Sequence, residues 1–330
     1  MQIIKIKKND AGQRLDKFLF KALPNLPASM LYKSVRTKKI KLNRKRCEIN
    51  TVLCEGDEIE LFLKDEFFEK KEAESAFRVL TPHIDVVYED ENILLVNKRA
   101  GLIVHSDDKE DQNTLISHVK AYLYRKGDYD PDSEQSFAPA LCNRIDRNTA
   151  GIVIAAKNAE ALRLINEAIK ERRVDKRYLA ACHGILTKKE DTLFGYLTKN
   201  ADENLVTVYA RKPRSCRESD IKEIRTRYRV LCEKNDLSLV EVELLTGRTH
   251  QIRAHFASID HALVGDGKYG INKADRARGY KFQALASYKL SFTFPENTTL
   301  AYLNDRAFSL PTASVWFVKE LFGLDKLPDS

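Results

Sequence analysis

The segment 142–151, which reads C-N-R-I-D-R-N-T-A-G, places a carboxylate between two arginines. Asp146 follows Arg144 by two residues and precedes Arg147 by one, and the apolar stretch 152–156 comes directly after the segment. Guanidinium groups within hydrogen-bonding reach would keep the aspartate ionised, as a nucleophile or a base requires, and would attract phosphate to the same cleft. Ion pairs at strand ends are common, so on residue types alone a structural Arg–Asp pair is the more frequent explanation.

Two further patterns contain the residue types of cofactor or metal sites. Residues 265–270 form a literal G-x-G-x-x-G, but they neither follow a clear long strand nor open a periodic helix, as a dinucleotide site needs. His250 and His255 are five residues apart and lack the H-E-x-x-H spacing of a metal pair. The six cysteines are scattered without a C-x-x-C pair, so reduced thiols are expected. We therefore expect neither a cofactor nor a metal.

The positive charge of the chain is concentrated near its N-terminus. The 330 residues are 43% apolar and 32% charged, as in soluble globular proteins, with a net charge of +8. Residues 1–50 hold 14 Lys and Arg against 3 Asp and Glu, a net of +11, so the remainder carries −3. Such segregation favours a polyanionic partner, because Lys and Arg at phosphates release counterions. Nucleic acid is the first candidate. An anionic membrane is the second, although the pattern does not resemble an interfacial anchor.

No signal-like apolar block opens the chain, and no run of about 18 apolar residues occurs. We therefore expect a cytoplasmic protein without a membrane partner.

The first 63 residues predict a small module of helices and strands. An apolar stripe over 15–23, closed by Pro24, indicates an amphipathic helix, and Ser29 is the expected cap of a second helix that continues to Val35. Strands are predicted over 40–43 and 57–63. A basic edge runs along the second helix end and the following turn: Arg36, Lys38, Lys39, Lys41, Arg44, Lys45 and Arg46. A merely solvated charged face is the alternative reading of that edge.

The remainder of the chain predicts an α+β fold. Residues 65–82 are charged and weakly periodic, which fits a linker, and the predicted domains are 1–75 and 76–330. Strands in runs, with helices at irregular intervals, favour a mixed, largely antiparallel sheet over a doubly wound one. The expected strands are 85–90, 92–97, 151–156, 178–183, 226–231 and 237–245, and the expected helices are 159–172 and one through 252–259.

Four ordered segments, completed by residues 265–270, resemble a known enzyme family. Residues 143–151 resemble the H-R-L-D-x-x-T-S-G motif of the RluA-type pseudouridine synthases, and the family order continues on both sides of it. The other matching segments are 97–105 (N-K-R-A-G-L-I-V-H), 176–180 (K-R-Y-L-A), 244–255 (L-L-T-G-R-T-H-Q-I-R-A-H) and 265–270. Residues 14–19, 40–43 and 55–59 are similar to the S-four-type RNA-binding domain, with Arg44 where that family often has glycine. In the synthase motifs the sequence departs at Asn143, Ala150 and Arg99, where the family has histidine, serine and proline.

The resemblance implies roles for individual residues. Asp146 matches the catalytic aspartate, which either attacks the anomeric carbon or removes the neighbouring ribose proton. Arg253 matches the arginine that pairs with this aspartate. Tyr178 matches the tyrosine that stacks on the uracil and is a candidate base for the proton on carbon 5. Arg144 is expected to contact the target phosphate or to fill the gap left by the flipped nucleotide. The S-four-type module is expected to bind RNA through Arg14, Arg36, Lys38, Lys39 and Lys41.

The expected protein is an isomerase that converts uridine to pseudouridine in RNA without a cofactor. By the resemblance, the substrate is 23S ribosomal RNA of the large subunit, and we expect a monomer. Transfer RNA is an alternative substrate. A non-catalytic RNA-binding protein of ribosome assembly is the other alternative, with Asp146 serving only structure.

Overall fold

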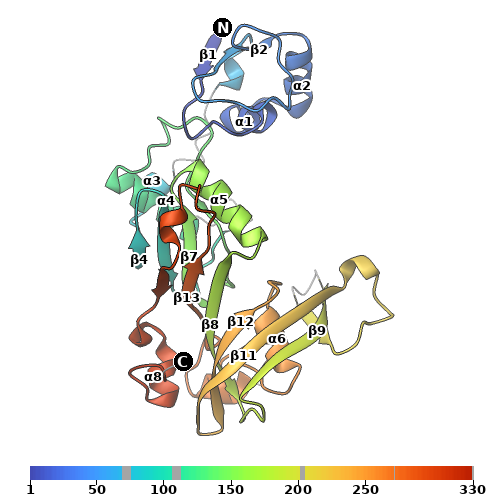
Figure 1. The fold of residues 1–330 in the computed structure, drawn as a ribbon, viewed down its shortest axis with the longest axis vertical. Coiled ribbons are helices and arrows are strands. Elements are labelled where there is room, and N and C mark those ends of the chain that lie inside the picture. Colours follow the sequence, from blue (N-terminus) through green and yellow to red (C-terminus); the bar gives the residue numbers. More distant parts are fainter. Residues whose placement is uncertain (69–75, 106–112, 201–204, 271, 329–330) are drawn as a thin grey trace.

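Figure 1 shows a computed structural model of the chain, which describes residues 1–68, 76–105, 113–200, 205–270 and 272–328. A small N-terminal module lies at one end of the long axis, and the main sheet extends away from it. Strands β9 (Glu190–Asn200) and β11 (Lys222–Lys234) project to one side of the body. Within the described residues, none of the helices combines the length and the apolarity needed to span a bilayer.

The N-terminal module consists of two helices packed on three antiparallel strands in the order β1-β3-β2. The apolar stripe predicted for the first helix faces inward, with Leu15, Phe18 and Leu19 fully buried. These side chains join Ile40, Ile59 and others in a hydrophobic core drawn from the first 68 residues. The elements are β1 (Gln2–Lys5), α1 (Leu15–Ala22), α2 (Ala28–Arg36), β2 (Ile40–Leu42) and β3 (Glu58–Leu61).

Two details of this module bear on the sequence predictions. The predicted cap at Ser29 is wrong. The helix α2 begins at Ala28, and the cap position two residues before Ser29 is occupied by Pro27, whose backbone is extended (φ −60°, ψ 144°). Proline suits a helix start, since its φ is already near the helical value. The turn after β2 keeps its tight form without glycine: Asn43 and Arg44 both have positive φ, 50° and 65°. Asn43 is braced by Asp57, 2.8 Å from its amide nitrogen.

The main sheet is mixed and largely antiparallel, as predicted. Among the described residues it contains 11 strands, ordered β10-β9-β11-β12-β8-β13-β7-β5-β4, with β14 on β13 and β6 on β7. Only the β13–β7 pairing within this described sheet is parallel. The remaining strands are β4 (Val86–Glu89), β5 (Ile93–Lys98), β6 (Ala140–Leu141), β7 (Ala150–Ala156), β8 (Val174–His183), β10 (Leu205–Tyr209), β12 (Leu237–Leu244), β13 (Leu285–Phe292) and β14 (Ala307–Ser309).

Helices cover both faces of the central strands. One face packs on α5 and α8 in a single large core. The opposite face carries two smaller cores, one under α4 and one under α6, and Ile145 packs against both. The loop that contains Asp146 therefore lies at the seam between α4 and α6. The helices are α3 (Ala76–Val79), α4 (Leu115–Lys126), α5 (Ala159–Lys170), α6 (Gln251–Ala257), α7 (Asn272–Ala277) and α8 (Trp316–Phe322).

Gly151 permits the parallel approach of β13 to β7. Its φ is +120°, and a Cβ there would lie 2.3 Å from the carbonyl oxygen of Ser287. Any larger residue would push β13 away from the start of β7. The glycine thus positions the strand that follows the Asp146 loop.

Polar contacts join the N-terminal module to the body. Ser136 donates to Asp10 over 2.6 Å and accepts from Gln13 over 2.8 Å, while Asn9 donates to Glu134 over 2.8 Å. The predicted linker 65–82 is more ordered at its ends than expected, because Phe67 and Phe77 are buried in neighbouring cores. The part of that linker from 69 to 75 lies outside the described residues.

Candidate active site

The loop between β6 and β7 is fixed by its own backbone and by Asn143. The side-chain oxygen of Asn143, which is buried, accepts the amide of Ile154 over 2.8 Å. The amide of Thr149 donates to the main-chain oxygen of Asp146 over 3.1 Å. The amide of Gly101 donates to the main-chain oxygen of Arg147 over 2.9 Å. Asn143, which departs from the family histidine, therefore has a structural function in this loop.

Lys98 also stabilises this loop, through hydrogen bonds from its buried side chain. Its side chain is fully buried, and its ammonium donates to the main-chain oxygens of Leu102 and Arg147, each over 2.8 Å, and of Arg99 over 3.1 Å. Burial lowers the pKa of Lys98 to about 7, while the charge of Asp146 opposes this shift. Lys98 joins the 99–102 turn to the residue that follows Asp146. Lys98 lies in a segment that resembles the family, but no function was predicted for it from the sequence.

Arg253, on α6, connects two carboxylates. Its Nε and Nη2 donate to Asp266 over 2.7 and 2.9 Å, and its Nη1 donates to Asp146 Oδ2 over 2.9 Å. The side chains of Arg253 and Asp266 are 8% and 0% exposed, whereas that of Asp146 is 25% exposed. Asp266 thus holds the arginine in place, and Asp146 faces the accessible side of the site.

The electrostatics of the Arg253–Asp266 pair favour the charged form of both groups. Burial alone would lower the pKa of Arg253, but hydrogen bonds and charge from Asp266 and Asp146 raise it above its usual range. Burial would likewise raise the pKa of Asp266, but the hydrogen bonds and charge of Arg253 hold it below the ordinary value. Asp146 therefore accepts a hydrogen bond from a guanidinium that is itself held in the charged form. The function of Asp266 was not predicted from the sequence, although the G-D pair at 265–266 was an available signal.

Tyr178 lies on β8, close enough to Asp146 to feel its charge. It is 6% exposed and pairs in register with Ser287 of β13. Burial raises the pKa of Tyr178 to about 12, opposed by the hydrogen bond with Ser287. The phenol is therefore neutral near pH 7.

Arg144 and Arg147 differ in their surroundings. Both side chains are exposed, but the Nε of Arg147 donates to Gly101 over 3.2 Å. Arg147 also lines a pocket of about 410 Å³ together with Arg99, Gly101 and other residues of the 99–103 turn. Exposed arginines thus lie on the same loop as Asp146, where a phosphate could be bound.

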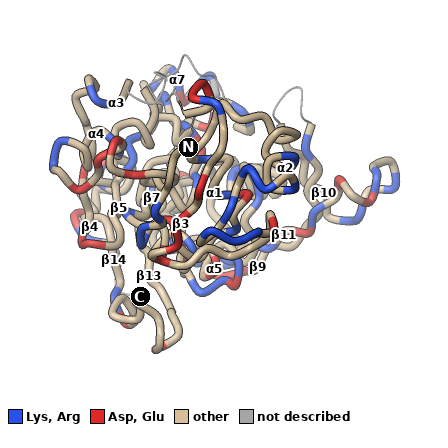
Figure 2. Tube along the Cα trace, turned by 90° about the horizontal axis from the view of Figure 1, so that it is seen from above, with Lys and Arg blue, Asp and Glu red and all other residues tan. Residues whose placement is uncertain are grey.

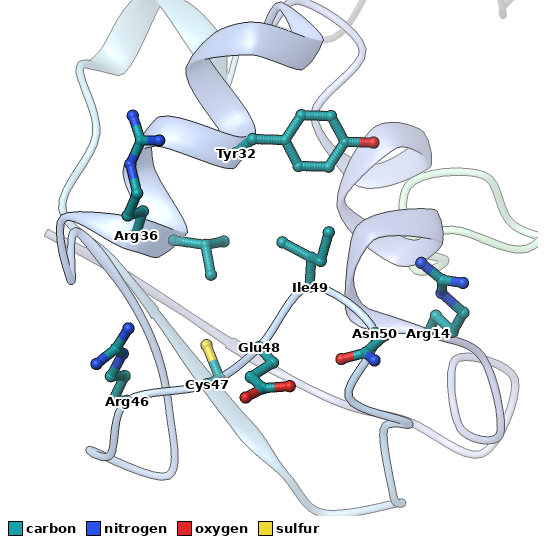
Figure 3. Close-up of a pocket in the computed structure, with 9 residues that line it drawn as sticks. Arg14, Tyr32, Arg36, Arg46, Cys47, Glu48, Ile49 and Asn50 are labelled. Carbon is teal, nitrogen blue, oxygen red and sulfur yellow. The ribbon is translucent and has the colours of Figure 1, made fainter.

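A second cluster of predicted residues lies on the N-terminal module. Figure 2 shows Lys and Arg gathered on α2 and the segment after it. Arg14 and Arg36 line one pocket of about 420 Å³ there, together with Tyr32 and Arg46 (Figure 3). The other lining residues are Val35, Cys47, Glu48, Ile49 and Asn50.

The remaining predicted residues of the basic edge are not among the lining residues of this pocket. Lys38 and Lys39 are exposed, and Lys41 lies over the ring of Phe62, 5.3 Å from its centre. The structure therefore brings Arg14 and Arg36 together but not Lys41. It adds Tyr32, a residue that is 42% exposed and was not selected from the sequence.

Comparison with known proteins assigns the class. Residues 92–258 match the family described as RNA pseudouridylate synthase, so the site belongs to an isomerase that acts on RNA. A protein of Mycoplasma genitalium named as an RNA pseudouridine synthase is 32% identical over 308 residues, covering 91% of this chain and 92% of its own. The ribosomal large subunit pseudouridine synthase C of Escherichia coli is 29% identical, covering 89% of each chain.

A solved structure supports the same assignment. The human RNA pseudouridylate synthase domain containing 1 is 25% identical with a TM-score of 0.52, covering 66% of this chain and 81% of its own. The chain belongs to the RNA pseudouridylate synthase family, and its motifs are of the RluA type. The non-catalytic alternative is thereby set aside.

Proposed function

We propose that this enzyme modifies uridines of 23S ribosomal RNA, with Asp146 as the catalytic residue. The observation that carries the assignment of Asp146 is its 2.9 Å ion pair with an arginine that Asp266 holds from behind. Similarity to the large subunit synthase C of Escherichia coli supports the ribosomal target. Residues 1–75 are proposed as an S-four-type RNA-binding domain with its linker, 76–330 as the catalytic domain, and the enzyme as a monomer.

The reaction needs an ionised carboxylate but no external reagent. The bond between the anomeric carbon and uracil N1 breaks, the uracil turns in the pocket, and the anomeric carbon bonds to carbon 5. The carbon 5 proton is then lost, and N1 gains a proton, so the product is an isomer. Asp146 acts either by attacking the anomeric carbon or by removing the adjacent ribose proton. Arg253 supports both routes, because it stabilises the carboxylate before the reaction begins.

Tyr178 is proposed to stack on the uracil as a neutral phenol. A pKa of about 12 leaves almost no phenolate near pH 7, so the ring is a better packing surface than a base at this pH. Because Tyr178 lies near Asp146, a uracil stacked on its ring would be held next to the ribose on which Asp146 acts. Arg144, exposed on the same loop, is proposed to bind the phosphate of the flipped nucleotide.

The test is pseudouridine mapping in ribosomal and transfer RNA. RNA from cells with the gene, without it, and with Asp146→Asn is compared, and Asp305→Asn serves as a control. Asp305 is exposed with a φ of 58°, a conformation that asparagine tolerates. We expect one or more 23S positions to lose pseudouridine in the deletion and in Asp146→Asn, but not in the control. Loss confined to transfer RNA would contradict the proposed substrate, and normal levels with Asp146→Asn would contradict the proposed catalytic residue.

A further inference from the structure

His250 adopts an unusual backbone conformation next to the candidate active site. It directly precedes α6 with φ 53° and ψ 17°, in the left-handed region that few residues other than glycine enter. Its side chain does not cap the helix, and it is 9% exposed. Residues held in such conformations cluster at functional sites, because the surrounding structure must stabilise them. The conformation directs the imidazole towards Asp146.

The two ring nitrogens of His250 face different partners. Nδ1 is 2.8 Å from the phenolic oxygen of Tyr269, and Nε2 is 3.9 Å from Asp146 Oδ2. The amide of Val206, on β10, donates to the same phenolic oxygen over 3.1 Å. Tyr269 is held from its other side as well, because the guanidinium of Arg253 lies 5.2 Å above its ring. A row of contacts thus runs from the β10 backbone to the candidate catalytic carboxylate.

These contacts determine where the protons lie. A backbone amide can only donate, so the Tyr269 oxygen accepts from Val206. Within the described residues, His250 Nδ1 is the acceptor that the phenolic proton can reach. A neutral imidazole has one donor and one acceptor nitrogen. Nδ1 therefore accepts, and the proton of the ring is on Nε2, facing Asp146.

The charges around the ring keep it neutral. Burial lowers the pKa of His250 most, and the charges of Arg253 and Lys268 lower it further, while Asp146 and Asp266 raise it. The net effect is a pKa below the ordinary value, so the imidazole is uncharged near pH 7.5. A neutral donor can approach the carboxylate without adding a third charge to the Arg253 pair.

We propose that His250 is a positioning residue that donates its Nε2 proton to Oδ2 of Asp146. The 3.9 Å separation shortens to a hydrogen bond when substrate is bound, since hydrogen bonds of catalytic groups are often long before binding. Arg253 already donates to Oδ2, so both donors act on one oxygen and Oδ1 is left for the ribose. Tyr269 fixes the tautomer that makes this possible. The inference rests on the proposed function of Asp146.

Matched amide substitutions separate the two nitrogens. His250→Gln places an amide donor near the position of Nε2, whereas His250→Asn reaches only the position of Nδ1. In single-turnover assays on a transcript carrying a mapped target uridine, we expect His250→Asn to lose about 10- to 100-fold in rate. His250→Gln should recover most of that loss, and RNA affinity should be unchanged in both. Equal rates for the two variants would overturn the proposal.

The tautomer of His250 can be measured without RNA. This test is therefore independent of the proposal that the enzyme modifies 23S ribosomal RNA. In the full chain labelled with ¹⁵N-histidine, we expect His250 to be the Nε2–H tautomer at pH 7.5. Tyr269→Phe keeps the ring above Arg253 but removes the phenolic proton, so a population of the Nδ1–H form should appear. An imidazolium, or a dominant Nδ1–H tautomer in the unsubstituted protein, would overturn the proposal even if pseudouridine formation by the enzyme is confirmed.

Discussion

Arg253 is fixed on Asp266 by two hydrogen bonds of 2.7 and 2.9 Å, and it offers its third nitrogen to Asp146. Asp266→Asn would replace one acceptor by an amide donor and leave a buried guanidinium nitrogen unpaired. Breaking a buried pair in this way costs about 3–5 kcal/mol. We expect urea unfolding to show a loss of that size, with a fall in the single-turnover rate. Asp260→Asn is the control, since Asp260 is exposed with a φ of 64°. Equal stability of the two variants would contradict this function of Asp266.

The same ion pair predicts a dependence of stability on pH. The pKa of Asp266 in the folded protein is below its ordinary value, although burial alone would raise it, because Arg253 stabilises the carboxylate. The unfolded chain therefore takes up the proton first as the pH falls below about 4. The stabilisation is complete above that pH and is lost as the pH falls towards the folded pKa. The free energy of unfolding should thus fall more steeply below about pH 4 in the unsubstituted protein than in Asp266→Asn. Parallel pH profiles would contradict the prediction.

The sequence predicted those helices and strands whose apolar pattern lies within the element itself. The helix from Leu15 and the strand from Ala150 were found because apolar residues repeat within one element. Strand β13 was missed, because its place beside β7 depends on a long-range pairing that only Gly151 permits. α4, β9 and β10 were missed as well, since their partners are set by the assembled sheet.

In the candidate site, too, some residues could be predicted from the sequence and others could not. The resemblance selected Asp146 and Arg253, which are 107 residues apart in sequence and in contact in the structure. It could not show that Asp266 holds the arginine or that His250 faces the carboxylate, because these are side-chain contacts that exist only once the chain has folded. The pKa of Tyr178 also depends on burial in the folded sheet. Local sequence does not contain that information.

Lys98 predicts a second rise of stability with pH, in the alkaline range. Burial lowers its pKa to about 7 in the folded protein, against about 10.4 for a lysine in the unfolded chain. Between these values the unfolded state binds a proton that the folded state does not, so stability rises with pH. The slope is at most about 1.4 kcal/mol per pH unit. Lys98→Met should remove this rise, which urea unfolding at pH 7, 8 and 9 would measure. Identical slopes for the two proteins would show that Lys98 is charged throughout.

Gly151→Ala should separate β13 from β7. The substitution combines an unfavourable φ of +120° with a Cβ only 2.3 Å from Ser287, which together cost about 3 kcal/mol or more. Gly56→Ala is the control, because Gly56 has a φ of +88° but nothing within 4 Å of the added Cβ. It measures backbone strain alone, about 1–2 kcal/mol. A midpoint of urea unfolding that is equally lowered in both variants would contradict the close packing inferred at Gly151.

The pocket on the N-terminal module predicts phosphate contacts by arginine and base stacking by tyrosine. The dependence of RNA affinity on salt concentration distinguishes the two. Arg36 and Arg46 line it, and Tyr32 is an exposed aromatic residue beside them. If both arginines bind phosphates, Arg36→Ala and Arg46→Ala should each lower the slope of log affinity against log salt concentration by about 1. Tyr32→Ala should weaken binding by about 1–3 kcal/mol without changing that slope, because stacking releases no counterions.

Lys41→Ala in the full chain is the matched control for that series, since Lys41 is basic and lies over Phe62 and outside the lining of the pocket. Filter binding of a 23S fragment at several salt concentrations gives all the slopes. If Lys41→Ala reduced the slope as much as Arg36→Ala, the whole basic edge would be the binding surface and the pocket would have no special function. A slope unchanged by either arginine substitution would place the RNA elsewhere on the molecule. We expect each arginine substitution to reduce the slope more than Lys41→Ala does. That result would make the pocket the point at which the module binds the RNA backbone.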